Sequence, residues 1–332
     1  MSSSVKRLLL SIILLLVSFS PLAFADSSSS ETQGVQIKNP ATDLWRAVRQ
    51  REFSGNANTN AKSNSAPLIN AEGNKWRQIR RKQLLPYGAY FMAGVISILF
   101  VLMIIVRRVK IPDGRSGKLL PRMSEMQRIS HWLLALLVGF MAITGLILLF
   151  GRFAIIPLIG VEAFSPVASA SKEGHNLFGP IIIVSLLLML VYFIRHNLPA
   201  LRDFKWIFTA GGLLAKGHLK IGFFNAGEKL LYWLTLSFGI TLAVTGLLLL
   251  FPEYQTLLKL NTQLTLIIHA ITALLLIALS LAHIWMATTV EGTIDAITSG
   301  SVDENWAKTH HSVWYEEMLA KKTVSEESTD DQ

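Results

Sequence analysis

The chain has 332 residues, of which 51% are hydrophobic and only 16% charged, and its formal net charge is +9. Soluble globular proteins carry about 25% charged residues, and apolar runs of about 20 residues recur here, so an ordinary soluble domain is excluded and a membrane protein is favoured. The absence of cysteine excludes disulfides, bound iron–sulfur clusters and covalently attached c-type haem.

The first 25 residues have the pattern of a secretory signal peptide. Lys6 and Arg7 precede a short apolar core, which ends in the small-x-small sequence "AFA". We expect a cleaved signal peptide at 1–25, with an uncleaved anchor as the alternative. Residues 26–83 are rich in Ser, Asn, Ala and basic residues, and they are expected to form a periplasmic N-terminal segment.

Five apolar runs predict membrane-spanning segments. Each is expected to be helical, because lipid offers no partner for unpaired backbone groups. Five such runs in one chain make buried helices of a soluble protein an improbable alternative. The runs are 87–106, within an additional transmembrane helix at 84–107, then 129–150, 179–194 with an extension back to His175, 230–251 and 264–290.

The charges of the loops predict the orientation. Loops 107–128 and 195–229 are rich in Lys and Arg, whereas 151–174 and 252–263 contain few cations. The positive-inside rule puts the two basic loops in the cytoplasm, so the C-terminus is cytoplasmic and the chain lies in a bacterial inner membrane, in contact with lipid. The basic run 75–82 would lie outside and does not fit this rule. Positive charge in such loops gives no reason to expect a nucleic-acid partner.

Four histidines fall at the ends of the predicted spans. His131 and His283 lie at the cytoplasmic level, and His175 and His269 at the periplasmic level. The rotation between His269 and His283 around a helix axis falls about 40° short of four full turns, so the two residues lie on the same face. Along the axis they are about 21 Å apart. Neutral imidazoles facing a bundle interior are good iron ligands, and two axial imidazoles per iron suit electron transfer.

Other functions for the histidines are weighed against haem ligation. A proton relay is the main rival, since transporters also bury histidines, but the apolar centres of the last four spans contain no Asp or Glu to pass protons onward. The remaining histidines are interpreted as surface residues of loops or the tail: His196, His218, His310 and His311.

Several motifs resemble the cytochrome b gamma subunit of respiratory formate dehydrogenase, in a long form with a signal peptide and an extra N-terminal helix. They are "RISHWLLALLVGFMAITGLIL", "GHNLFG", "RHNLPALRDFKWI", "FNAGEKLLYW", "LIIHAITA", "LAHIWMA" and "WAKTHHSVWYEEM". The resemblance implies an all-α, four-helix di-haem cytochrome b domain at 122–320, followed by a cytoplasmic polar tail at 321–332. It also implies two haem b groups, a molybdenum or tungsten catalytic subunit and an iron–sulfur subunit as partners, and quinone as electron acceptor.

Carried over to this chain, the resemblance assigns His175 and His269 to a periplasmic haem and His131 and His283 to a cytoplasmic haem. It also implies a quinone site at an Asn-Ala-Gly stretch followed by Gln. Asn225, Ala226 and Gly227 match that stretch, but Glu228 stands at the Gln position, where a carboxylate could assist proton uptake. The alternative is that Asn225 simply caps the fourth span.

Three functions remain open from the residues. The first is an electron-transfer subunit of a formate:quinone oxidoreductase, with no catalytic residue of its own. The second is the cytochrome b of a membrane-bound hydrogenase or thiosulfate reductase, which would use the same cofactor with another electron donor. The third, from a different class, is a haem-free proton or small-molecule transporter.

Overall fold

The computed structural model describes residues 78–106, 108–209, 220–258 and 261–330. The predicted signal peptide, nearly all of the predicted N-terminal segment and His218 lie outside the described residues. In the described part, four helices are long and apolar enough to cross a membrane, or five when a bent helix pair is counted as one span. The expected all-helical membrane architecture is confirmed.

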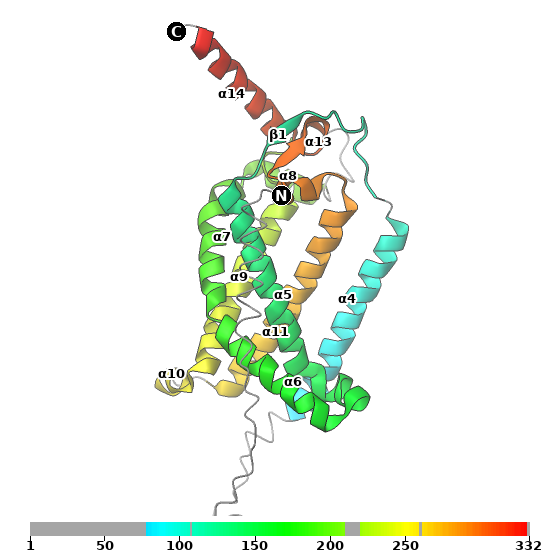
Figure 1. Cartoon of the computed structure of the whole chain (residues 1–332), viewed down its shortest axis with the longest axis vertical. Helices are drawn as coiled ribbons and strands as arrows, with labels where there is room; N and C mark the ends of the chain where they lie inside the picture. Colours follow the sequence, from blue (N-terminus) through cyan, green and yellow to red (C-terminus); the bar gives the residue numbers. More distant parts are fainter. Residues whose placement is uncertain (1–77, 107, 210–219, 259–260, 331–332) are drawn as a thin grey trace, which may run out of the picture. The chain divides into compact units, whose positions relative to one another are not determined.

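Four of the spans are single helices. They are α4 (Leu85–Ile105), which continues a π-helical turn η1 (Arg80–Leu84), α5 (Glu125–Ala154), α9 (Ala226–Leu250) and α11 (Thr262–Thr289). In Figure 1, α5, α7 (Ile181–Asn197), α9 and α11 run side by side, and α4 lies against α11. The additional N-terminal helix therefore packs on the outside of a four-helix bundle.

Polar caps fix where two of these spans, α5 and α11, begin. The side chain of Ser124 accepts from the backbone of Gln127, and the side chain of Gln127 accepts from the backbone of Ser124. The side chain of Asn261 accepts from the first amides of α11. These caps satisfy amides that a helix start leaves unpaired, and they set the boundary between apolar span and polar loop.

The third span differs from the prediction. Residues 151–174, expected to be a loop, are helical: 151–154 complete α5, and 156–174 belong to helix α6 (Ile156–Phe178), which packs along α5. Helix α6 is kinked at Gly160, where φ is +80°, and it is bent by 45° from α7 across the break at Gly179 and Pro180. His175 therefore lies near the end of α6 and not at the start of α7.

A small folded cap covers the end of the bundle where α5 and α9 begin. We call it the end cap, and it comprises residues 108–124, 220–225 and 290–321. It contains β1 (Leu119–Pro121) paired antiparallel with β2 (Ser301–Asp303), together with α12 (Thr293–Thr298), α13 (Glu304–His310) and the start of α14 (Ser312–Asp330). Its buried apolar core is formed by Ile111, Ala296, Val302, Trp306, Ala307 and Trp314.

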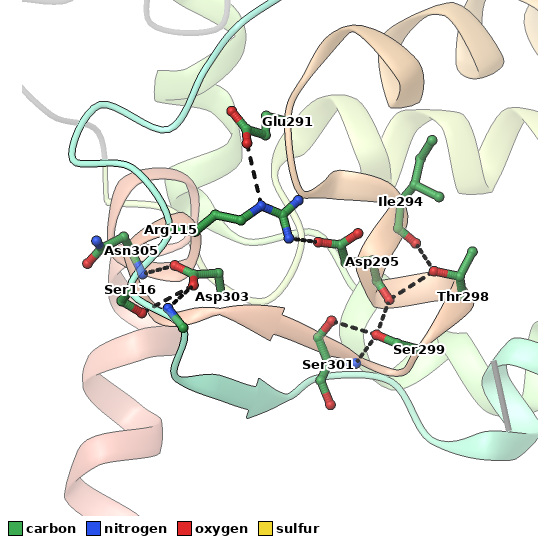
Figure 2. Close-up of polar contacts among 11 residues, drawn as sticks. Arg115, Ser116, Glu291, Ile294, Asp295, Thr298, Ser299, Ser301, Asp303 and Asn305 are labelled. Atoms are coloured by element: carbon green, nitrogen blue, oxygen red, sulfur yellow. Dashed lines mark hydrogen bonds and ion pairs between the residues drawn. The ribbon is translucent and has the colours of Figure 1, made fainter.

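Ion pairs and hydrogen bonds join the two main segments of the end cap (Figure 2). Arg115 contacts Glu291 at 3.4 Å and Asp295 at 2.9 Å. The buried carboxylate of Asp303 accepts from the hydroxyl of Ser116 and, at 3.0 Å, from the backbone of Gly117. Burial opposes this charge, but these hydrogen bonds hold the pKa of Asp303 below its usual value. The loop after α4 is thereby fixed to the segment after α11.

Two short helices complete the described bundle. Helix α10 (Pro252–Leu257) follows α9, and α8 (Leu201–Phe208) follows α7 and packs on α9. Helix α8 is strongly amphipathic, and its exposed apolar side chains include Leu201, Phe204 and Phe208. An exposed apolar face of this kind is typical of a helix lying at a membrane surface.

Candidate functional site

The four histidines expected to act together lie in two pairs within the bundle. The rings of His131 on α5 and His283 on α11 have centroids 6.2 Å apart, with an interplanar angle of 63°. The rings of His175 on α6 and His269 on α11 are also 6.2 Å apart, with an angle of 71°. The structure thus brings together the same partners that the sequence pairs by membrane level.

The ring separation matches the space that one metal ion needs. A metal-to-imidazole bond is about 2.0 Å long, so two coordinating nitrogens lie about 4 Å apart and the centres of their rings about 6 Å apart. Both pairs meet this requirement. In the described part of the chain, no cluster of three or more His, Asp or Glu side chains is arranged to hold a metal. The donor set therefore consists of two imidazoles per site, which suits a metal whose other ligands come from a macrocycle.

Two threonines hold the rings of the second pair, and the sequence analysis did not identify them. The Oγ1 atom of Thr144 lies 2.9 Å from Nδ1 of His175, and that of Thr245 lies 2.8 Å from Nδ1 of His269. Both threonines belong to a repeat of the form A-x-T-G-L-x-L-L-F, at 142–150 on α5 and at 243–251 at the end of α9. This repeat is the signal that could have revealed them.

The first pair lies at the level of the end cap. Nδ1 of His131 is buried and has no hydrogen-bond partner within the described residues. The neighbouring Trp132 donates from its indole nitrogen to the carbonyl of Ile297 at 3.1 Å, which fixes this turn of α5 to the segment after α11. The two pairs therefore have the same ring separation but different surroundings.

The residues expected at a quinone site form the start of α9. The Asn225 side chain accepts from the backbone of Glu228 at 2.9 Å, and the Glu228 carboxylate accepts from the backbone of Asn225 at 2.7 Å. The capping role that the sequence left open is thus present. A Cβ atom added at Gly227 would lie 2.8 Å from the ring of Trp206, so close packing of α8 explains the glycine. The side-chain nitrogen of Asn225, Nδ2, is not used by the cap.

The prediction that His311 is a surface residue is wrong. Its side chain is 2% exposed, and its Nδ1 lies 2.8 Å from the carbonyl of Gly222. Since a carbonyl only accepts, Nδ1 carries the proton and Nε2 accepts from Arg122 at 3.2 Å. Burial, followed by the charge of Arg122, holds the pKa of His311 well below its usual value. His196 is half-buried and stacks on Phe223 at 4.1 Å, so it is not a free surface residue either.

Arg122 lies at the centre of the end cap among aromatic rings. Its guanidinium carbon is 4.6 Å from the ring centre of Phe223, 4.7 Å from that of Trp314 and 5.0 Å from that of Trp306. Burial lowers the pKa of Arg122 from its usual value to about 10, and the carboxylate of Glu228 opposes this shift. The start of α9 is therefore electrostatically coupled to the end cap.

Comparisons with known proteins identify the bundle. The family model for prokaryotic cytochrome b561 matches residues 122–300. The nitrate-inducible formate dehydrogenase cytochrome b556 subunit of Escherichia coli is 29% identical over 206 residues, which cover 61% of this chain and 93% of that protein. A second Escherichia coli formate dehydrogenase cytochrome b556 subunit is 27% identical over 210 residues, 62% of this chain and 96% of that protein.

A third relative supports the same resemblance. The formate dehydrogenase cytochrome b556 subunit of Haemophilus influenzae is 29% identical over 210 residues, which cover 58% of this chain and 82% of that protein. The family match extends over more than half of the chain, from the end cap through the last span, and it includes all four paired histidines. The chain therefore belongs to the prokaryotic cytochrome b561 family, whose members are all-helical membrane haem proteins.

Proposed function

We propose that this chain is the membrane-anchoring di-haem cytochrome b subunit of a formate dehydrogenase. The observation that carries the proposal is the pair of bis-histidine sites, each with ring centroids 6.2 Å apart. The fit of the residues to haem b is supported by that spacing and by a donor set of neutral imidazoles. When bound, the two haems supply one-electron carriers between an iron–sulfur partner and quinone.

The residues of the chain have separate roles in this proposal. His175 and His269 hold the periplasmic haem, and His131 and His283 hold the cytoplasmic haem, about 21 Å further along α11. Because each site takes two ligands from the protein, neither leaves a position for oxygen, which favours electron transfer over oxygen chemistry. The partners implied by the resemblance to formate dehydrogenase subunits are a molybdenum or tungsten catalytic subunit and an iron–sulfur subunit. The chain itself has no cysteine to hold clusters, which is consistent with electrons arriving from such a partner.

The orientation is part of the proposal. Loops 107–128 and 195–229, which lie at the end-cap side of the bundle, are rich in Lys and Arg, so the positive-inside rule favours the cytoplasm of a bacterium for this side, with the chain in the inner membrane. Electrons then enter at the periplasmic pair and leave at the cytoplasmic pair. The relatives' names favour formate dehydrogenase over hydrogenase or thiosulfate reductase as the partner enzyme.

Haem content tests the ligand assignment directly. We expect His269→Ala and His283→Ala each to halve the ratio of haem to protein in a pyridine-haemochrome assay, because the two sites have separate ligands. His196→Ala is a matched control, since His196 stacks on Phe223 and has no histidine partner. The co-purified catalytic subunit, identified by mass spectrometry, tests the formate dehydrogenase assignment. Unchanged haem in either paired variant would contradict the proposal.

Quinone reduction is proposed to occur beside the cytoplasmic pair, near Asn225, Gly227 and Glu228. The side-chain nitrogen of Asn225, Nδ2, takes no part in the helix cap and can donate to a quinone carbonyl. Asn225→Asp separates the two roles, because Asp caps a helix as well as Asn but lacks the NH₂ donor. We expect this variant to keep both haems reducible through the partner while quinol formation falls. Normal quinol formation would place the site elsewhere.

A further inference from the structure

The two threonines of the repeat each make a pair of contacts that determines the direction of their hydrogen bonds. Oγ1 of Thr144 lies 2.9 Å from the carbonyl oxygen of Phe140, and Oγ1 of Thr245 lies 2.7 Å from that of Thr241. A carbonyl only accepts, and a hydroxyl has one hydrogen, so each threonine donates to its own helix. The same oxygen must therefore accept from the imidazole beside it.

This direction assigns the tautomer of both rings. Nδ1 of His175 and Nδ1 of His269 carry the protons that Thr144 and Thr245 accept. Each ring then has an unprotonated Nε2 with its lone pair available for a metal. The threonines thus prepare both histidines of one site in the form that iron requires.

The glycine after each threonine allows the ring to lie close to the helix. A Cβ atom added at Gly145 would be 3.4 Å from Cε1 of His175, and one added at Gly246 would be 3.4 Å from Cε1 of His269. A separation of 3.4 Å is ordinary van der Waals contact, so the histidine ring lies directly against the helix at each glycine and leaves no room for a side chain larger than a methyl group. The Thr-Gly dipeptide therefore works as a unit that appears twice, once on α5 and once on α9.

The other pair of histidines lacks this support at one ring. Nδ1 of His131 is buried and has no hydrogen-bond partner within the part of the chain that the structure describes. A hydrogen bond from Nδ1–H to an acceptor raises the basicity of an imidazole ligand, and such contacts are one means by which a protein adjusts the potential of an iron centre. The two sites are therefore unequal in electron donation.

We propose that Thr144 and Thr245 are positioning residues that fix His175 and His269 as strong electron donors and thereby give their haem the lower reduction potential of the two. This inference rests on the proposed function. More electron donation stabilises the ferric state, so an electron entering at this site passes to the other with a favourable free-energy change. The repeat thus sets the direction of transfer toward the cytoplasmic pair.

Redox titration of the purified complex tests this role. Thr144→Val and Thr245→Val keep the side-chain shape and remove the acceptor, whereas Thr144→Ser and Thr245→Ser keep the hydroxyl. Thr241→Val is a matched control, because Thr241 donates to the carbonyl of Ser237 on the same helix without contacting a histidine. The His283→Ala background, which retains only the periplasmic haem under the proposal, assigns each change to its site.

The expected result is a higher midpoint potential of the periplasmic haem in each Val variant, a larger shift in the double variant, and wild-type values in the Ser variants and in the control. Loss of that haem in the Val variants with retention in the Ser variants would also support the role of the hydroxyl. Unchanged potentials in haem-replete Val variants, or an equal shift in Thr241→Val, would overturn the inference alone. A haem-free wild-type complex would overturn the proposed function itself.

Discussion

The ion pair between Asp203 and Lys229 is expected to hold α8 against the start of α9. Nζ of Lys229 lies 2.8 Å from Oδ2 of Asp203, and the two side chains are only 8% and 13% exposed. Nζ also donates to the carbonyl of Leu198 at 2.9 Å, and Oδ2 also accepts from the backbone of Ala200 at 2.7 Å. Both charges are thus shielded from solvent and have more than one partner.

The structure sets the size of the expected effect. Removing one partner of a buried ion pair costs about 3–5 kcal/mol, because an uncompensated charge remains. The low end applies to Lys229→Met, since Asp203 keeps the amide of Ala200 and some solvent contact. We expect about 3 kcal/mol for Lys229→Met and a similar cost for Asp203→Asn. The double variant should cost much less than the sum, because it leaves no unpaired charge.

Hydrogen exchange of α8, followed by mass spectrometry in detergent micelles, measures this coupling as a local opening free energy. A loss of about 3 kcal/mol speeds exchange about a hundredfold, because each 1.4 kcal/mol is a factor of ten. Lys205→Met is the control, since Lys205 is exposed on the same helix. Additive effects in the double variant, or unchanged exchange in Lys229→Met, would refute the reasoning.

Two further predictions concern the end cap. An unfolded histidine binds a proton below about pH 6.5, whereas burial and Arg122 keep His311 neutral in the fold. The end cap should therefore lose up to about 1.4 kcal/mol of unfolding free energy per pH unit below that value. Hydrogen exchange at 296–320, corrected for intrinsic rates, should reveal this loss, and His311→Gln should flatten the dependence of exchange on pH. Gly292→Ala should lower the thermal stability more than Gly114→Ala. Both glycines have positive φ, so each substitution incurs about 1–2 kcal/mol of backbone strain, but only at Gly292 would the new Cβ also meet Trp306, at 2.8 Å. Equal costs would show that this contact relaxes freely.

The spans and the histidine pairs were accessible from sequence because both depend on local patterns. Continuous apolar runs predict helices of the length a bilayer requires, and α4, α5, α9 and α11 match the predicted runs to within a few residues at most boundaries. The pairing followed from helix periodicity on α11 and from membrane level, which need no knowledge of side-chain packing. Their role as haem ligands stays a prediction until haem content is measured.

Helix α6 was missed because its sequence combines features that predict a loop. Gly160 and Pro166 interrupt the helical pattern, and Glu162, Lys172 and Glu173 make the segment too polar for a span. The structure accommodates Gly160 with a kink, where its φ is positive, and Pro166 lies within the helix after this kink. Packing along α5 then stabilises a helix that local propensity does not favour, which is the usual way tertiary contacts override sequence preference.

The burial of His311 could not be predicted, because its partners come from distant segments. Arg122 lies 189 residues before it in the chain, and the contacting carbonyl belongs to Gly222, 89 residues before it. Neither contact produces a periodic pattern in the sequence, and a histidine beside charged residues in a C-terminal segment is predicted to be solvent-exposed. Only the folded end cap brings a cation, a carbonyl and a neutral imidazole together.

The threonine repeat lies between these two cases. The motif is visible in the sequence, but a Thr in an apolar helix is usually explained by a hydrogen bond to its own backbone, as both threonines also make. Only the structure shows that the threonine of each copy contacts a histidine of the same pair, His175 on α6 in one case and His269 on α11 in the other. Thr144 and His175 come from different helices, and so do Thr245 and His269. Under the proposed function, the duplication meets one shared requirement, which is that both rings have the same tautomer at a single metal.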